Sequence, residues 1–193
     1  TGESRQQIVN SPHMEAFRAK GIEVLVLSDP VDEMWVSAGA EFDGKSFQSI
    51  AKGAVDLDGD DEDADDSAKE EQNKTYADLL GWLTSTLSDD VSETRLSSRL
   101  TESPACLVGD TFSMSPQLEK LYRASGQEFP KSKRALELNP DHPLVAALSK
   151  AYGAGDHEQL VPTAKLLYGM AVIAEGGELD DPLPHADLAR QRI

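Results

Sequence analysis

The chain has 193 residues, of which 39% are hydrophobic, and a formal net charge of −17. This length suits one large domain or two small ones. The acidity disfavours nucleic acid and membrane surfaces as partners, because proteins bind both through Lys and Arg. Cys106 is the only cysteine, so no intrachain disulfide can form and a cytoplasmic protein is predicted. Because the chain begins at Thr1 without a Met, we expect a piece of a longer protein.

Residues 1–55 are predicted to form a small α/β layer. The run from Ile22 to Leu27 is almost continuously apolar, which is typical of a strand covered on both faces. Asp43-Gly44 between aromatic residues is the turn signal of a hairpin. The expected elements, in chain order, are helices over residues 3–10 and 12–20, a strand over 22–27, a helix from Asp29-Pro30 to Gly39, and a hairpin involving Phe42, Phe47 and Ile50.

Residues 56–66 contain eight acids and no base, so self-repulsion predicts a solvated linker. The spacing of the aspartates resembles the start of a calcium-binding loop. Counted from Asp56, however, Asp61 stands where Gly is required and Ser67 stands where Glu is required. The register from Asp58 fails in the same way, and we predict no metal site here.

Residues 67–193 are predicted to form a second domain. The fold class expected for the whole chain is α+β, with a small α/β/α layer subdomain followed by a helical domain that contains a short three-stranded sheet. The expected elements are a helix around 76–87, a strand pair at 94–100 and 105–108, a third strand at 135–138, a helix over 142–152 with Asp141 as N-cap, a helix over 158–175, and a last helix from Pro182 to Ile193.

The most informative short segment covers residues 112–122. A helix would place Met114, Leu118, Leu121 and Tyr122 on one face, since they are spaced i, i+4, i+7 and i+8. Such a stripe is usually part of a core. The segment is also short and flanked by polar residues, so the alternative is an exposed surface for other proteins. The pattern leaves both interpretations open.

The helix expected over 158–175 is apolar nearly all round and must be covered on both sides. Its apolar residues are Leu160, Ala164, Leu166, Leu167, Met170, Ala171, Ile173 and Ala174. A domain this small has few elements with which to cover them. A second subunit and burial within one chain therefore remain equal alternatives.

No phosphate-binding glycine motif is present, and the four histidines are not spaced as paired metal ligands. Asp29, Asp32 and Glu33 could form an acid–base cluster at the end of the expected strand. The alternative is that they are first-turn acids that complement the helix dipole. We therefore predict no catalyst. The rival hypotheses are a small α/β enzyme that uses these acids and an acidic cation-binding protein centred on residues 56–66.

Several ordered motifs resemble heat-shock protein 90 chaperones, and more closely the bacterial branch of the high-temperature protein G type. Segments similar to the end of the middle domain are Thr1-Gly2-Glu3-Ser4, Asn10-Ser11-Pro12, residues 20–25, Asp29-Pro30 with Asp32-Glu33, and residues 41–45. Segments similar to the C-terminal dimerisation domain are Arg99-Leu100-Thr101 with Ser103-Pro104-Ala105, residues 137–142, and Leu179 with Asp181-Pro182. The resemblance covers nearly the whole chain, apart from the acidic segment.

The resemblance implies an ATP-dependent, homodimeric chaperone that binds partly folded client proteins and possible cochaperones. It implies that ATP and magnesium belong to an N-terminal domain absent from this chain, which would then hold no cofactor and be no enzyme. It places client contacts on Met114, Leu118, Leu121 and Tyr122, and on Glu33 with Met34 or Trp35 pointing outward. It places the dimer contact on the eight apolar residues of the 158–175 helix and on Leu183, Leu188 and Ile193 of the last helix.

Overall fold

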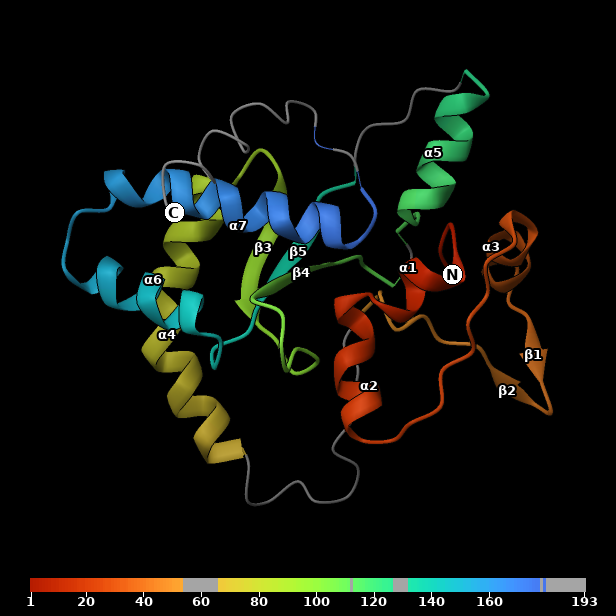
Figure 1. The fold of residues 1–193 in the computed structure, drawn as a ribbon, viewed down its shortest axis with the longest axis horizontal. Helices are drawn as coiled ribbons and strands as arrows, with labels where there is room; N and C mark the ends of the chain where they lie inside the picture. The colour runs from red at the N-terminus through yellow and green to blue at the C-terminus, as the bar shows by residue number, and fades with distance from the viewer. Residues whose placement is uncertain (54–65, 112, 127–131, 178, 180–193) are drawn as a thin grey trace.

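The structure is a computed structural model that describes residues 1–53, 66–111, 113–126, 132–177 and 179. It is a mixed helix-and-sheet fold. An N-terminal layer of short helices and a hairpin lies beside a three-stranded sheet, and long helices cover the sheet (Figure 1). Two features predicted from sequence fall largely or wholly outside the described residues: the acidic segment at 56–66 and the last helix with Leu183, Leu188 and Ile193. The division into two domains stays a prediction.

The N-terminal layer covers residues 1–53. Side-chain caps begin its helices: Ser4 accepts from the amide of Gln7 at 3.2 Å, and Asp29 accepts from the amide of Val31 at 3.0 Å. Its elements are α1 (Arg5–Val9), η1 (Pro12–Met14), α2 (Glu15–Ala19), α3 (Pro30–Ser37), β1 (Glu41–Phe42) and β2 (Lys45–Ser46).

The hairpin is confirmed, because β1 and β2 pair antiparallel around Asp43-Gly44. Both turn residues have positive φ, 51° and 71°, as a two-residue turn of this kind requires. Phe47 lies just after the pairing and packs on Trp35, with ring centroids 5.1 Å apart.

The predicted strand over residues 22–27 is wrong. These residues form no strand, and the side chains of Ile22 and Leu25 are 42% and 67% exposed. A strand covered on both faces needs neighbouring strands, and the only strands described in this layer are the two-residue strands of the hairpin. The apolar run therefore leaves part of its surface in solvent.

The sheet contains β3 (Val91–Leu96), β4 (Ala105–Val108) and β5 (Arg134–Leu138) in the order β3-β5-β4. β5 runs parallel to β3 and antiparallel to β4. The prediction that the first two strands form a pair is wrong, because the third strand lies between them. Buried residues in four of five β5 positions explain its central place, and residues 97–104 connect the two outer strands.

Two helices pack on the sheet, α4 (Asp66–Thr86) on β3 and α7 (Val161–Ala174) on β4. α6 (Pro143–Gly153) packs against α4 and against η2 (Glu158–Leu160), which precedes α7. The N-cap of α6 is His142 rather than the predicted Asp141, and His142 Nδ1 accepts from the amide of Leu144 at 3.1 Å. Pro162 lies in the first turn of α7, where its missing N–H costs no helical bond. The helices and the sheet share one core, built on Leu79, Leu83, Leu87, Val91, Leu107, Leu136, Leu138, Val145, Leu148 and Leu167.

α5 (Pro116–Ala124) projects beyond the sheet, above the N-terminal layer (Figure 1). Ser115 begins the helix by accepting from the amide of Leu118 at 3.2 Å. Met114 therefore precedes the helix, and the predicted stripe of four residues is not a single helical face. The helix is short because Gly126, with φ of 81°, follows its last turn.

Candidate functional site

A cleft of about 800 Å³ lies between the N-terminal layer and the part of the chain that leads from β4 into α5. One side is formed by residues of α1, η1 and α3 and by residues 47–53. The opposite side includes Gly109, Met114 and Leu118, and the C-terminal end of α7 contributes Glu175. The fold thus brings segments distant in sequence to one concave surface.

Three of the predicted client-contacting residues line this cleft: Met114, Leu118 and Glu33. Met114, Leu118 and Tyr122 are half-buried, so they are neither fully core nor fully exposed. The side chain of Leu121 lies outside the described part of the structure. The cleft therefore brings together the two regions on which the resemblance places client contacts: the segment before and within α5, and the region around α3.

Glu33 does not fit a surface role, because only 7% of the residue is exposed. Its carboxylate accepts a hydrogen bond from the hydroxyl of Thr1 and lies 4.0 Å from Lys52 Nζ. Met34 and Trp35 are 58% and 49% exposed, so both face solvent and neither is the single outward residue. Glu33 thus lines the cleft from a nearly buried position, and a client contact at each of the three residues stays a prediction.

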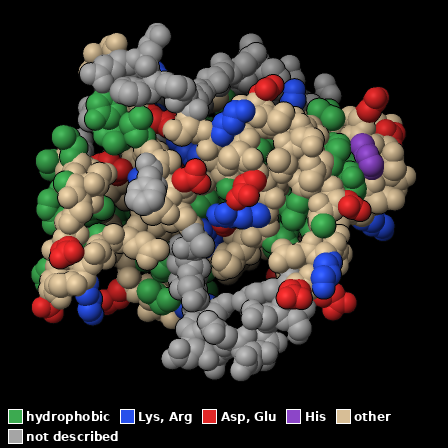
Figure 2. Space-filling model, turned by 180° about the vertical axis from the view of Figure 1, so that it is seen from behind, with side chains coloured by type: hydrophobic (Ala, Val, Ile, Leu, Met, Phe, Trp, Pro, Cys, Tyr) green, Lys and Arg blue, Asp and Glu red, His purple; other side chains and the backbone are tan. Residues whose placement is uncertain are grey.

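The N-terminal layer carries a group of exposed hydrophobic side chains that we call the layer patch. Its members are Ile22, Leu25, Val31, Met34, Trp35 and Phe42. Viewed from behind, hydrophobic side chains gather over the layer with acidic side chains beside them (Figure 2). Soluble proteins rarely expose many large hydrophobic groups together unless they bind something there. The apolar run at 22–27 was the sequence signal for this surface, although it was interpreted as a strand.

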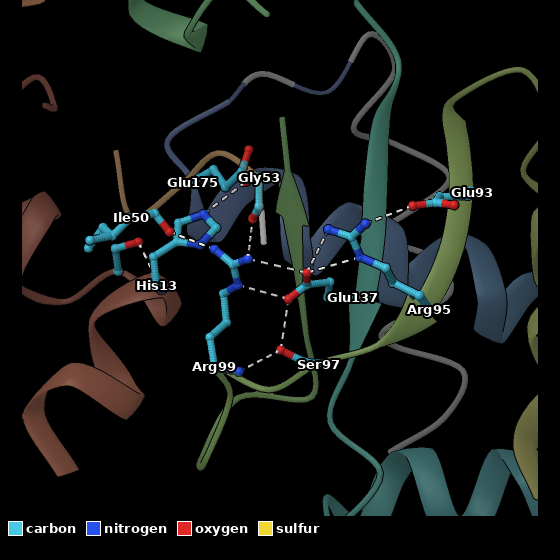
Figure 3. Close-up of polar contacts among 10 residues, drawn as sticks. His13, Ile50, Gly53, Glu93, Arg95, Ser97, Arg99, Glu137 and Glu175 are labelled. Carbon is cyan, nitrogen blue, oxygen red and sulfur yellow. Dashed lines mark hydrogen bonds and ion pairs between the residues drawn. The ribbon is translucent and has the colours of Figure 1, made fainter. Parts of the chain in front are cut away.

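A buried set of charges lies at the base of the cleft. His13 Nε2 is 3.2 Å from Glu175 Oε1 (Figure 3). Arg134 donates to the other oxygen of Glu175 at 3.1 Å. Arg134 also donates to Glu119 of α5 at 3.3 Å. These contacts join the N-terminal layer, the central strand, α5 and the end of α7. Sequence reasoning missed His13, because an isolated histidine carries no spacing signal.

Arg99 is the most deeply buried charge in the described structure, with 1% of the residue exposed. Its Nε donates to Glu137 at 2.9 Å, and its two terminal nitrogens donate to the carbonyl oxygens of Ile50 and Gly53, each at 2.6 Å (Figure 3). The two carbonyls belong to the N-terminal layer, whereas Glu137 belongs to β5. No pattern in the sequence marked this arginine as an internal residue.

Glu15 makes the second connection between the layer and the loop at 97–104. Its carboxylate accepts from the amides of Thr101, Glu102 and Ser103 at 2.7 to 3.1 Å. Burial raises the pKa of Glu15, but the hydrogen bonds from Ser103, Glu102 and Thr101 outweigh it, and the net pKa is below the usual value. The ionised carboxylate is therefore the form that holds the loop.

The predicted dimer residues on α7 divide into two groups. Leu160, Ala164, Leu167 and Ala171 are buried in the core of the same chain, so burial within one chain accounts for that face. Met170 and Ile173 are 42% and 62% exposed, and Leu166 and Ala174 are half-buried. Only this second group is available to a partner subunit.

The acids of the rival enzyme hypothesis do not converge. Asp29 and Asp32 form a reciprocal capping box at the start of α3, in which the amide of Asp29 donates to Asp32 at 2.9 Å. Glu33 points instead toward Lys52. Within the described ranges, no group of three or more His, Cys, Asp or Glu side chains is arranged to hold a metal ion. The capping role explains Asp29 and Asp32 without catalysis.

Comparisons with known proteins identify the family. A model of the Hsp90 protein family matches residues 1–193. The chain is 62% identical to the chaperone protein HtpG of Rhodococcus jostii, 59% identical to that of Mycobacterium tuberculosis and 58% identical to that of Nocardia farcinica. Each match covers 100% of this chain. The chain spans about 30% of the length of these relatives.

The comparisons correct two predictions. From the resemblance we expected no enzyme, because the nucleotide-binding domain would be missing, and we placed ATP and magnesium in that missing domain. The Hsp90 family model matches the whole of residues 1–193. The prediction that this chain is no enzyme and the prediction that ATP and magnesium belong to a missing domain are therefore both wrong. Among the described residues no metal-holding group is found, and no residue is assigned here to magnesium or ATP. None of the described helices is both long and apolar enough to cross a membrane.

Proposed function

Because the chain belongs to the Hsp90 protein family, we propose that it supplies the client-binding and dimerisation portion of a chaperone that assists protein folding. In this proposal residues 1–55 correspond to the end of the family's middle domain and residues 67–193 to its dimerisation domain. A cytoplasmic location and possible cochaperones belong to the same proposal. The single observation that supports it best is the cleft at which Met114 and Leu118 meet the N-terminal layer.

Client binding is supported by the chemistry of this surface. A partly unfolded chain exposes apolar side chains and unpaired backbone groups together. The cleft offers Met114 and Leu118 beside the polar Gln7 and Ser49, and the layer patch lies on the same layer. Thioether and aromatic groups adapt to varied partners, because they are flexible or present large, weakly directional faces. Each contact is weak, so several must act together.

Dimerisation is supported by the exposed face of α7. Met170 and Ile173 are one turn apart on a helix whose opposite face is already buried. A second copy that covers this face would remove both side chains from water. Two copies would then present two clefts, and the effective concentration of the second cleft would strengthen binding to one client chain.

The test of client binding is a variant of the cleft. Met114→Ser with Leu118→Ser removes two half-buried apolar groups, and we expect about fivefold weaker binding of permanently unfolded carboxymethylated lactalbumin, measured by fluorescence anisotropy. The control variant, Ala146→Ser with Ala147→Ser, changes two exposed positions of α6 that do not line the cleft. It should bind like the unmodified chain.

Two results would contradict the proposal. One is unchanged binding in the cleft variant while its melting temperature stays within a few degrees of that of the parent chain. The other is a collapse of thermal stability in that variant, which would mean that Met114 and Leu118 serve the core. The enzyme alternative makes a different prediction, a reaction abolished by Glu33→Gln, and no contact in the described structure favours it.

A further inference from the structure

We propose that Arg99 is a positioning residue that sets the spacing between the two walls of the cleft, and through that spacing the affinity of the cleft for unfolded protein. The inference rests on the proposed function, because it concerns the regulation of the same cleft. We call residues 50–53 the layer wall, and Gly109 with Met114 and Leu118 the sheet wall. Residues of both walls line the cleft.

Arg99 connects the layer wall to the most constrained part of the sheet. Its terminal nitrogens hold the carbonyls at both ends of the layer wall, Ile50 and Gly53, while its Nε holds Glu137 on the central strand (Figure 3). Between those two carbonyls, Lys52 forms an isolated bridge with Gly109 of the sheet wall. The amide of Gly53 donates to the carbonyl of Gly109 at 2.9 Å, and the amide of Gly109 donates to Ala51 at 3.2 Å.

Glu137 is also held in place by residues other than Arg99. Ser97 donates to one of its oxygens at 2.9 Å, and Arg95 donates to the other at 3.0 and 3.1 Å. Only 4% of Glu137 is exposed, and its strand is paired on both sides. Arg99 therefore holds the layer wall at a fixed position relative to the central strand.

An arginine at this buried position has a different effect from apolar residues. A buried ion pair adds little net stability compared with well-packed apolar groups, because desolvation offsets the attraction. The ion pair instead fixes the relative positions of the groups that it joins. The planar guanidinium serves one carboxylate and two carbonyls at fixed angles, which the single ammonium of lysine cannot do. The layer wall is thus held at one distance from the sheet by directional bonds rather than by apolar packing, which tolerates sliding.

Arg95 provides a matched control within the same network. It donates to the same Glu137 and lies on β3, but its side chain is 39% exposed and its remaining bond goes to Glu93 at 2.8 Å. No bond from Arg95 to the layer is recorded within the described residues. Arg95→Met therefore perturbs Glu137 without releasing the layer wall, whereas Arg99→Met releases the wall directly.

The experiment measures spacing and affinity in the same proteins. Spin labels at Ala38→Cys on the layer and Asp78→Cys on α4 report the distance between layer and sheet by pulsed electron spin resonance. Both positions are exposed, and the native Cys106 is buried. Labelled chains are diluted with unlabelled chains, so that only distances within one chain are recorded. Affinity is measured with carboxymethylated lactalbumin.

We expect Arg99→Met to broaden the distance distribution and to weaken binding by about five- to tenfold, the lower end of a typical coupling between sites. Arg95→Met should leave both unchanged. If Arg99→Met fails to fold, Arg99→Lys replaces it and should show the same two changes, because lysine cannot serve both carbonyls and Glu137 together.

An unchanged distance distribution and affinity in the Arg99 variant would overturn the inference, and so would equal effects in the Arg95 variant. An unmodified chain that binds no lactalbumin would instead refute the proposed function. In that case the distance measurements still decide whether Arg99 sets the spacing of the two walls.

Discussion

At the scale of single residues, buried charges govern how the N-terminal layer meets the sheet. Arg99 and Glu15 both act on the loop at 97–104, from opposite directions. Arg99 reaches out of this loop to two carbonyls of the layer, and Glu15 reaches from α2 into three amides of the loop. Charged groups make the stronger hydrogen bonds in proteins, so a few side chains suffice to join the two parts.

Glu15 predicts a pH dependence of stability. Because its pKa is lowered in the folded chain, its contribution is present above the usual value of 4.5 and is lost as the pH falls through the folded value. We expect Glu15→Gln to lower the free energy of unfolding by about 1 kcal/mol at pH 7, a figure reduced for partial exposure. Urea unfolding at pH 7 and at pH 3 measures the difference, which should shrink at pH 3.

Glu71→Gln, at an exposed position of α4, serves as the comparison and should show no such difference at either pH. A Glu15→Gln penalty that persists undiminished at pH 3 would show that the carboxylate is not what holds the loop.

At the scale of elements, α7 has two different faces. Leu160, Ala164, Leu167 and Ala171 complete the core, whereas Met170 and Ile173 remain in solvent. This helix is apolar nearly all round for two reasons: one face is buried in the core of the same chain, and the other face is exposed and available to a partner. The end of this helix is also connected to the cleft, because Glu175 contacts His13 and Gly176 accepts from Lys120 of α5 at 3.0 Å.

Self-association is the property that the exposed face of α7 should control. We expect Met170→Asp with Ile173→Asp to raise the dissociation constant of the proposed dimer at least about tenfold, because central apolar contacts dominate interfaces. Sedimentation equilibrium measures this constant. Lys165→Ala, at an exposed polar position of the same helix, should leave it unchanged. A double variant that still dimerises like the parent chain would exclude this face as the contact.

At the scale of the whole molecule, the layer and the sheet should behave as one cooperative unit. Across the junction, the amide of Gly53 donates to the carbonyl of Gly109 at 2.9 Å, and the amide of Gly109 donates to the carbonyl of Ala51 at 3.2 Å. Ala16 also donates to the carbonyl of Arg99 at 3.1 Å. The layer has few buried apolar residues of its own, chiefly Ile8, Ala16 and Phe17. Its stability therefore depends on the sheet.

Hydrogen exchange tests this dependence. We expect the amide of Gly53 to exchange as slowly as that of Cys106, which pairs with Glu137 within the sheet, because both open only when the molecule unfolds globally. The amide of Phe47, whose bond to Ala40 is 3.5 Å long in the small hairpin, should exchange much faster by local opening. Fast exchange at Gly53 beside slow exchange at Cys106 would mean that the layer detaches by itself.

Much of the local structure follows from the sequence, because it depends on neighbouring residues. Asp43-Gly44 predicts the hairpin turn, Asp29-Pro30 predicts a helix start, and the apolar periodicity that begins at Tyr76 follows α4 to its end. The ordered motifs also identified the Hsp90 family, which the comparisons support over all 193 residues. These signals need no knowledge of how distant segments meet.

Tertiary structure decided the rest, since it depends on pairings between distant segments. Residues 22–27 found no strand partner, so the most apolar run of the layer stayed partly in solvent. β5 took the centre of the sheet, a place that no local pattern assigns. Arg99 became internal only because Glu137 and the carbonyls of Ile50 and Gly53 surround it. From sequence alone, a charged side chain is predicted to lie at the surface. Only the partners that the tertiary structure brings close can make its burial favourable.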